Sequence, residues 1–339
     1  MKFSHAISLF CGLLISASAW SADTVVYEPK PGPGKGKHVV FLSGDEEYRS
    51  EEGLPQMAKI LAERHGFKCT VLFAIDTKTG VIDPTITTSL PGAEALDSAD
   101  AIVMLLRFRA WPDDQMKHFV DAFLAGKPII ALRTATHAFN YPGNSQSPYA
   151  KFSWGNHTWP GGFGKQVLGE TWVDHWAKHK VEATRGILDT NNMFLPIMFG
   201  VRDVFGTTDV YEAHPPADAK ILLWGQALSG MTPESAPANY RRKRQGGQEQ
   251  GINDPMMPIA WTREYKNESG NVNKVFCTTM GAATDLLNED LRRLVVNSVY
   301  WGVGLNVPSF ANVNLVGEFK PSMYGFNGHK KGVKPDELK

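Results

Sequence analysis

Short apolar runs alternate with amphipathic segments through the first half of the chain, and this alternation restricts the fold more than any other feature. Each apolar run has the length of a buried strand, and each amphipathic segment repeats its apolar residues at helical spacing. This alternation predicts a doubly wound α/β fold with a mostly parallel sheet and helices on both faces. The expected strands are 38–43, 68–75, 101–106 and 127–132, and the expected helices are 55–65 and 112–124.

The second half of the chain is less regular, because long polar connections separate its strand candidates. Strands that are not joined by helices pair antiparallel more readily than parallel. We therefore expect an antiparallel extension of the sheet, followed by a helix that covers one face. The strand candidates are 170–173, 220–226, 258–265 and 274–279, and the helix is expected over 288–300.

The first residues of the chain have the pattern of a secretory signal peptide. Lys2 precedes an apolar run at 6–15, and small residues follow at 16–19. Such a segment is removed on export, so we expect a mature protein in the periplasm or outside the cell, with no membrane-spanning segment. The expected organisation is a signal peptide at 1–21, a linker at 22–37, an α/β domain at 38–305 and a C-terminal surface tail at 306–339.

Charge and cysteine content exclude several classes of function. The 35 Lys and Arg residues balance the 35 Asp and Glu residues, so no positive field favours a nucleic acid as partner. Beyond the signal segment the cysteines are Cys69 and Cys277, each in an apolar strand-like run. We expect two buried thiols with no catalytic or metal-binding role, and a disulfide between them is the alternative.

Three of the expected strands end in polar turns. Neighbouring parallel strands open onto one crevice at their carboxyl ends, so these turns should lie close together although they are far apart in sequence. The turns carry Asp45, Glu46 and Glu47 after the first strand, Arg107 and Arg109 after the third, and Arg133, Thr134 and His137 after the fourth.

The residue types in these turns suit different tasks. His137 and the three carboxylates are candidates for acid–base catalysis, because imidazole titrates near neutral pH and crowded carboxylates raise one another's pKa. Arginine offers fixed, forked donors that suit sugar oxygens, so we expect substrate binding at Arg107, Arg109 and Arg133, with Thr134 beside them. The alternative for the carboxylates is structural: ion pairs with Arg107 or Arg109 that hold the loops together.

Tryptophan and histidine interleave in the segment 154–179. Sugar rings present apolar C–H faces beside polar edges, and aromatic side chains flanked by hydrogen-bonding groups match that surface. Trp154 and Trp159, with His157 between them, are therefore candidates for sugar binding. The alternative is that the tryptophans of this segment pack it onto the sheet.

His175 and His179 are the candidates for a metal site. They stand four residues apart, which on a helix places both imidazoles on one face. The segment lacks the glutamate of an HExxH motif, and an irregular loop is the alternative to a helix, so the favoured expectation is no cofactor. Signatures of serine hydrolases, dinucleotide-binding turns and P-loops are also missing from the sequence.

Four stretches together resemble one known family. They are SGDEEYRSEEGLP, KPIIALRTATHAF, GETWVDHWAKHK and CTTMGAATDL, and they look like the ThuA-like (trehalose utilisation) family of the class I glutamine amidotransferase-like superfamily, in particular its exported planctomycete-type members. The resemblance implies the flavodoxin-like fold of that superfamily and a link to carbohydrate utilisation. It also points to His157, which follows Phe152 and Gly155. Amidotransferases place a cysteine where this chain has Arg133, so glutamine amidotransferase chemistry is not expected.

Two functions from different classes follow from these features. The first is an enzyme acting on a sugar, such as a keto-sugar or glycoside, as a hydrolase, lyase or isomerase without a cysteine nucleophile. The second is a non-catalytic sugar-binding or scaffold protein. A metal-dependent hydrolase using His175 and His179 is a third reading. In each case the expected partner is a small carbohydrate.

Overall fold

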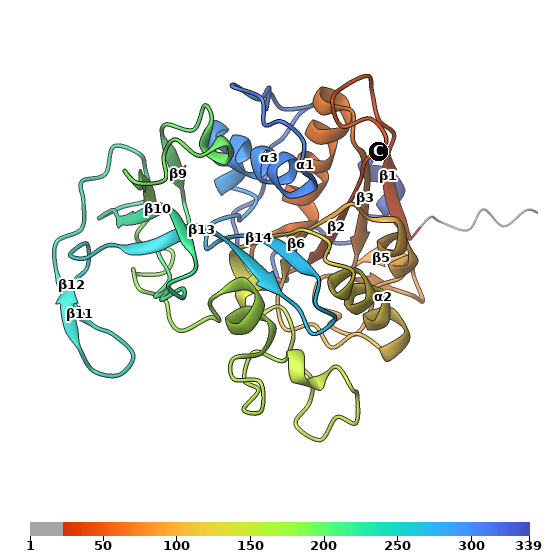
Figure 1. Ribbon diagram of the computed structural model, residues 1–339, viewed down its shortest axis with the longest axis horizontal. Helices are drawn as coiled ribbons and strands as arrows, with labels where there is room; N and C mark the ends of the chain where they lie inside the picture. Colours follow the sequence, from red (N-terminus) through yellow and green to blue (C-terminus); the bar gives the residue numbers. More distant parts are fainter. Residues whose placement is uncertain (1–22) are drawn as a thin grey trace, which may run out of the picture.

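One ten-stranded sheet organises residues 23–339, the part of the chain that the computed structural model describes (Figure 1). The predicted signal peptide lies outside the described residues. Five parallel strands form the centre of the sheet, which confirms the parallel core expected from the sequence. In spatial order they are β3 (Lys68–Phe73), β2 (His38–Gly44), β6 (Ala101–Leu106), β7 (Ile129–Leu132) and β14 (Val272–Thr278).

The order of these five strands determines where their polar turns meet. Numbered along the chain, they lie in the order 2-1-3-4-5, the order of flavodoxin-type sheets, whose ligand crevice opens where the winding reverses, between the first and third strands. Those strands are β2 and β6, which pair in parallel. The turns that follow β2, β6 and β7 therefore converge at one edge of the sheet.

Antiparallel strands extend the sheet at both edges. β1 (Thr24–Tyr27) pairs with β3 at one edge, inside the segment expected to be a linker. At the other edge the predicted antiparallel extension is confirmed. It comprises β13 (Met257–Lys266), β10 (Lys220–Ala227), β8 (Thr184–Leu188) and β9 (Val204–Gly206). Two short hairpins complete the strands: β4 (Ile75–Asp76) with β5 (Val81–Ile82), and β11 (Arg241–Lys243) with β12 (Glu249–Gly251).

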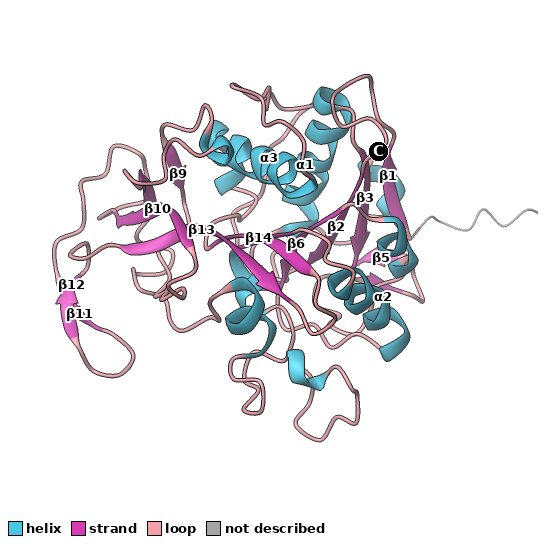
Figure 2. Cartoon of the chain, viewed as in Figure 1, coloured by secondary structure: helices cyan, strands magenta, loops and turns pink. Residues whose placement is uncertain are grey.

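The three α-helices of the described residues cover the sheet (Figure 2). Alternate residues of β2 divide between two apolar clusters, one shared with α1 (Ser50–His65) and α3 (Glu289–Val303) and the other with α2 (Asp113–Leu124). Strands covered on both sides read as continuous apolar runs, as β2 and β6 do. Within residues 23–339, none of the helices combines the length and apolar character that a membrane span requires.

Short helical turns occupy several connections. They are Ala93–Ser98, Arg133–His137, Ala150–Phe152, Pro196–Met198, Asp285–Leu287 and Pro335–Leu338 in 3-10 form, and Gly164–Leu168 as a π-turn. The strand predicted over 170–173 is wrong, because this segment is an irregular loop. Trp172 of this loop contacts the site, as described below.

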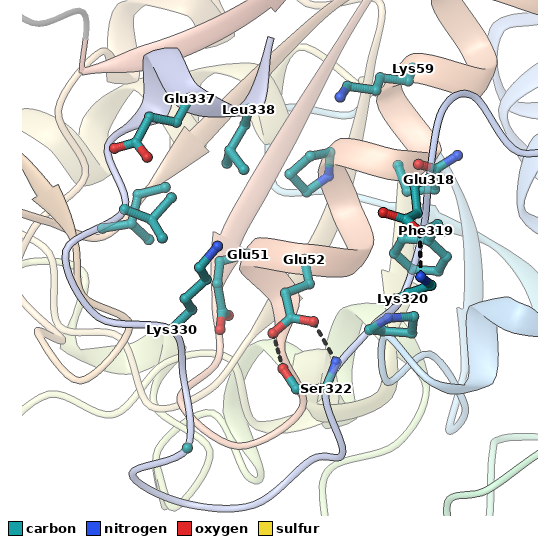
Figure 3. A pocket seen from close by; sticks show the side chains of 16 residues that line it. Glu51, Glu52, Lys59, Glu318, Phe319, Lys320, Ser322, Lys330, Glu337 and Leu338 are labelled. Carbon is teal, nitrogen blue, oxygen red and sulfur yellow. Dashed lines mark hydrogen bonds and ion pairs between the residues drawn. The ribbon is translucent and has the colours of Figure 1, made fainter.

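The segment after α3 runs back across the molecule. The hydroxyl of Tyr27 in β1 donates to the carbonyl of Leu338 at 2.6 Å, so the C-terminus lies beside the first strand. Tyr324 is buried, and the backbone N–H of Gly325 donates to the carbonyl of Glu47 at 2.8 Å. Together with α1 this segment encloses a pocket of about 600 Å³, lined in part by Glu51 (Figure 3). The C-terminal segment thus reaches the turn after β2.

Candidate functional site

Arg133 occupies the elbow where β7 turns into a short helix. Its φ is 40°, in the left-handed region that non-glycine residues rarely adopt and that occurs most often where surrounding structure enforces it. The backbone N–H of Arg133 donates to the carbonyl of Met280 at 3.0 Å, which fixes the elbow against the end of β14. The side chain is completely buried and therefore points into the protein.

The guanidinium of Arg133 is enclosed by aromatic rings and hydrogen-bond acceptors. Its central carbon lies 3.7 Å from the ring centroid of Tyr211 and 4.8 Å from that of Tyr48. It donates to the Asp209 carboxylate at 2.8 Å, to the Asp209 carbonyl at 2.6 Å and to the Thr279 carbonyl at 2.7 Å. Arg133 therefore holds Asp209 in place and is not presented to solvent.

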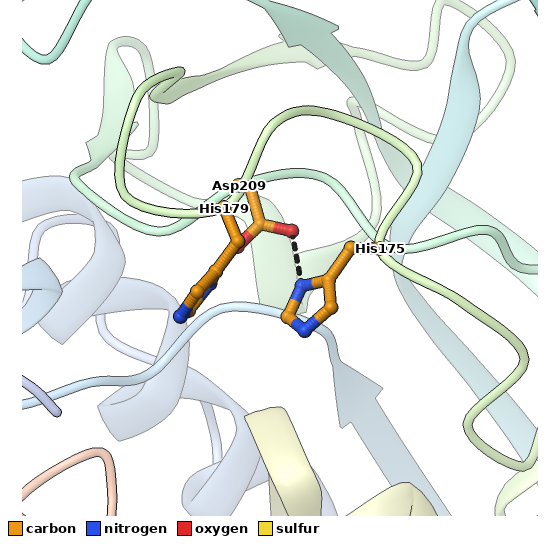
Figure 4. Close-up of side chains that lie close together, drawn as sticks. All are labelled: His175, His179 and Asp209. Atoms are coloured by element: carbon orange, nitrogen blue, oxygen red, sulfur yellow. Dashed lines mark hydrogen bonds and ion pairs between the residues drawn. The ribbon is translucent and has the colours of Figure 1, made fainter. Parts of the chain in front are cut away.

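Asp209 in turn orients two histidines (Figure 4). His175 Nδ1 donates to one carboxylate oxygen at 2.7 Å, and His179 Nδ1 donates to the other at 2.9 Å. Burial by itself would raise the pKa of Asp209, but the charge of Arg133 and the bonds from the two histidines outweigh burial and hold that pKa well below its usual range. Asp209 is thus a permanent anion beneath the two imidazoles.

Glu47 brings the turn after β2 into the same cluster. Its carboxylate lies 3.1 Å from His179 Nε2, so His179 has a carboxylate partner at each ring nitrogen. Burial lowers the pKa of His179, but the bonds to Asp209 and Glu47 outweigh burial and raise that pKa to about 9. Tyr324 from the C-terminal segment packs on the same ring at 5.7 Å. We call His175, His179, Asp209 and Glu47 the histidine cluster.

The loop that carries both histidines is irregular, so their spacing does not come from a helix. It is held against the loop of Asp209 by backbone bonds from Trp176 and Ala177 to the carbonyl of Val210, at 2.8 and 3.0 Å. Each of His175, His179 and Asp209 offers one atom that could bind a metal, a ring nitrogen or a carboxylate oxygen. These three atoms lie within 4.8 Å of one another. Within residues 23–339, these three are the residues that could hold a metal ion.

Asp45 ties the turn after β2 to the turn after β7. It is fully buried and accepts hydrogen bonds from the backbone N–H groups of Glu47 and Tyr48, at 2.7 and 2.6 Å, and from the hydroxyl of Thr134. Burial and the neighbouring charge of Glu46 raise the pKa of Asp45 to about 6. Neither Asp45 nor Thr134 reaches solvent. Their hydrogen bonds therefore position the turn that carries Glu47.

Glu46 forms ion pairs with the arginines of the turn after β6. Its carboxylate bonds to Arg107, and Arg109 donates to it at 2.9 Å. Arg109 is fully buried and also donates to the carbonyls of Pro84 and Ile86. This is the structural arrangement that the sequence offered as the alternative for the carboxylates. Arg107 keeps about a fifth of its side chain exposed and is the one of the three candidate arginines that a ligand can touch.

His137 lies beneath the aromatic part of the site. Its ring centroid is 5.0 Å from that of Phe108 and 5.7 Å from that of Trp172. Burial lowers the pKa of His137 well below its usual value, and the positive charges of Arg107 and Arg133 add to the shift. A buried, neutral imidazole supports the rings above it and is not placed to exchange protons with solvent.

Three partly exposed aromatic rings form a continuous patch, which we call the aromatic surface. The ring centroid of Phe108 lies 5.6 Å from that of Trp154, and the ring centroid of Trp154 lies 6.1 Å from that of Trp172. Phe108 has a φ of 52°, an unusual conformation for an aromatic residue, so its ring is held there by its surroundings. Trp172 contacts His175 at 5.9 Å. The aromatic surface therefore ends at the histidine cluster.

The remaining sequence candidates lie apart from this arrangement. Trp159 packs on Phe152 at 5.4 Å, and His157 is exposed in the same loop. Among the described residues, no ring contact joins either of them to the aromatic surface. Cys69 and Cys277 are free and buried, as expected. Sequence reasoning missed Asp209 and Tyr324, because both lie in loops whose position depends on distant contacts.

Comparison with known proteins gives structural neighbours only. The chain matches no protein-family model, and it matches no curated protein. A protein from Parabacteroides merdae described as ThuA-like has 12% identity and a TM-score of 0.46, covering 81% of this chain and 92% of its own. A second protein described as ThuA-like, from Bacteroides uniformis, has 15% identity and the same TM-score, covering 80% and 92%. Family membership stays a prediction.

Proposed function

We propose that this chain is an exported ThuA-like protein that binds a sugar or oxidised sugar at the carboxyl edge of the sheet and transforms it. The observation that carries the proposal is the junction between the aromatic surface and the histidine cluster at His175. Flat apolar faces and convergent polar groups within one site are what a pyranose ring requires. The resemblance in sequence adds the carbohydrate-utilisation context, and the signal peptide expected from the sequence adds export.

Each part of the site has a separate task in this proposal. The rings of Phe108, Trp154 and Trp172 receive the C–H face of the sugar, and the exposed part of Arg107 donates to its oxygens. The fully buried side chains position the loops without touching the ligand. They are those of Arg109, Arg133, Asp45 and Thr134.

The groups available for proton transfer are those of the histidine cluster. The side chains of His175 and His179 are 30% and 25% exposed, so a ligand can reach them, whereas His137 is enclosed. Glu47 is the one of the three sequence-predicted carboxylates that contacts one of these imidazoles, that of His179. General acid–base chemistry by these groups fits a hydrolase, lyase or isomerase and needs no cysteine nucleophile.

A sugar panel tests the proposal. The purified protein is heated with mono-, di- and 3-keto-sugars, and the sugar that raises the melting temperature is then followed by NMR for turnover. A ligand at a hundred times its Kd stabilises the native state by about 2.7 kcal/mol. Stabilisation with turnover supports an enzyme, and stabilisation without turnover supports the sugar-binding alternative. No stabilisation by any sugar would contradict both.

A further inference from the structure

The two imidazoles and the carboxylate of Asp209 converge on a single small volume. The ring centroids of His175 and His179 are 4.4 Å apart, and each ring bonds to a different oxygen of the same carboxylate. The potential metal-ligand atoms of the three residues lie within 4.8 Å of one another. Small shifts of these side chains would bring three ligand atoms to the distances of about 2.0–2.2 Å that zinc requires.

We propose that His175, His179 and Asp209 bind one divalent transition-metal ion of the zinc type. Two imidazole nitrogens and one carboxylate oxygen are a donor set that zinc and neighbouring transition metals accept in proteins, whereas magnesium and calcium take oxygen ligands. Three protein ligands leave coordination positions free. Both histidines are partly exposed, so these positions are open to solvent.

The surroundings have the features of an outer coordination shell. Arg133 donates to Asp209, and Glu47 contacts His179, so two of the three ligands are held by charged partners. A divalent cation would meet two carboxylates, those of Asp209 and Glu47, and ligands whose orientation is already fixed.

The metal site deepens the proposed function and rests on it for its substrate. Trp172 contacts His175, so a sugar lying on the aromatic surface presents its edge to the metal. Neighbouring carbonyl and hydroxyl oxygens, as in a keto-sugar, can occupy two free coordination positions together. The metal would polarise the carbonyl, and Glu47 would be the remaining group for proton transfer.

Titration with metal alone tests this proposal independently of any sugar. The protein is stripped with a chelator, dialysed, and titrated with Zn²⁺ by calorimetry and with Co²⁺ by visible absorption, whose intensity reports low-coordinate binding. Wild type is compared with His175→Ala and His179→Ala, and with His157→Ala as the matched control, since His157 is exposed and lies outside the cluster. Circular dichroism establishes that each variant folds.

We expect one ion per chain, with affinity reduced on the order of 100-fold or more in either cluster variant and unchanged in the control. Absence of saturable binding to folded wild type would overturn the metal site. Equal affinity in wild type and both cluster variants would also overturn it. Metal binding without stabilisation by any sugar would leave the metal site standing and contradict the sugar proposal.

Discussion

Arg133 donates to Asp209 at 2.8 Å, and the side chains of both residues are completely buried. This ion pair joins the elbow after β7 to the loop that orients His175 and His179. Arg133 is therefore an internal support for the site. Its charge holds Asp209 ionised, and Asp209 holds the two imidazoles.

Arg133→Met should be strongly destabilising. Removing one partner of a buried ion pair leaves the other charge uncompensated, at a cost of about 3–5 kcal/mol. Urea denaturation measures the change in the free energy of unfolding. Arg241→Met is the control, because the ion pair of Arg241 with Glu249 is exposed and should contribute less than about 1 kcal/mol. Similar small losses in the two variants would contradict the role assigned to Arg133.

Glu51 should make stability depend on pH. Its side chain is buried in α1, and neither oxygen bonds to any other residue that the structure describes. Burial raises the pKa of Glu51 from 4.5 to about 8. Because the folded pKa lies above the unfolded one, the stability associated with the protonated carboxyl is fully present below pH 4.5. It is lost as the pH rises to about 8, by on the order of 4 kcal/mol.

Glu51→Gln removes this dependence and should be more stable than wild type at pH 8.5, with a much smaller difference at pH 5. Urea unfolding at the two pH values measures both. Glu63→Gln, an exposed position on the same helix, should behave as wild type at each pH. An equal effect of Glu51→Gln at both pH values would show that the carboxyl does not titrate as described.

Phe108 should tolerate glycine better than alanine. Its φ of 52° costs a residue with a side chain about 1–2 kcal/mol, whereas glycine adopts it freely. Both substitutions remove the ring, so the difference in unfolding free energy between Phe108→Gly and Phe108→Ala isolates the backbone. We expect the glycine variant to be more stable by about 1 kcal/mol. An alanine variant that is the more stable of the two would contradict this conformation.

Tyr324 should contribute to stability although it lies in the C-terminal segment. Its ring packs on Tyr48 at 5.2 Å and on His179 at 5.7 Å, and its hydroxyl donates to the carbonyl of Thr207. Tyr324→Ala should cost about 3–5 kcal/mol, as for other buried aromatic residues. Phe194→Ala, at a ring that is 78% exposed, is the control and should cost little. Equal effects in urea denaturation would mean that the segment does not pack on the site.

The sequence was sufficient for the parallel core and its turns. β2, β6 and β7 are continuous apolar runs that end in polar residues, so local composition reveals them. The partners of those turns could not be found in this way. Asp209 and Tyr324 lie in loops positioned by distant backbone contacts, and neither stands in a recognisable motif. The tryptophans show the same limit: Trp154 and Trp159 are alike in sequence, yet only Trp154 joins the aromatic surface.

Calorimetric titration of the stabilising sugar into wild type, Trp172→Ala and Trp159→Ala tests the central claim most directly. Trp172 joins the aromatic surface to His175, and Trp159 lies outside it. We predict that Trp172→Ala weakens binding by about tenfold or more, corresponding to at least about 1.4 kcal/mol, with Trp159→Ala unchanged. Unaltered affinity in folded Trp172→Ala, or an equal loss in both variants, would contradict a sugar site at this junction.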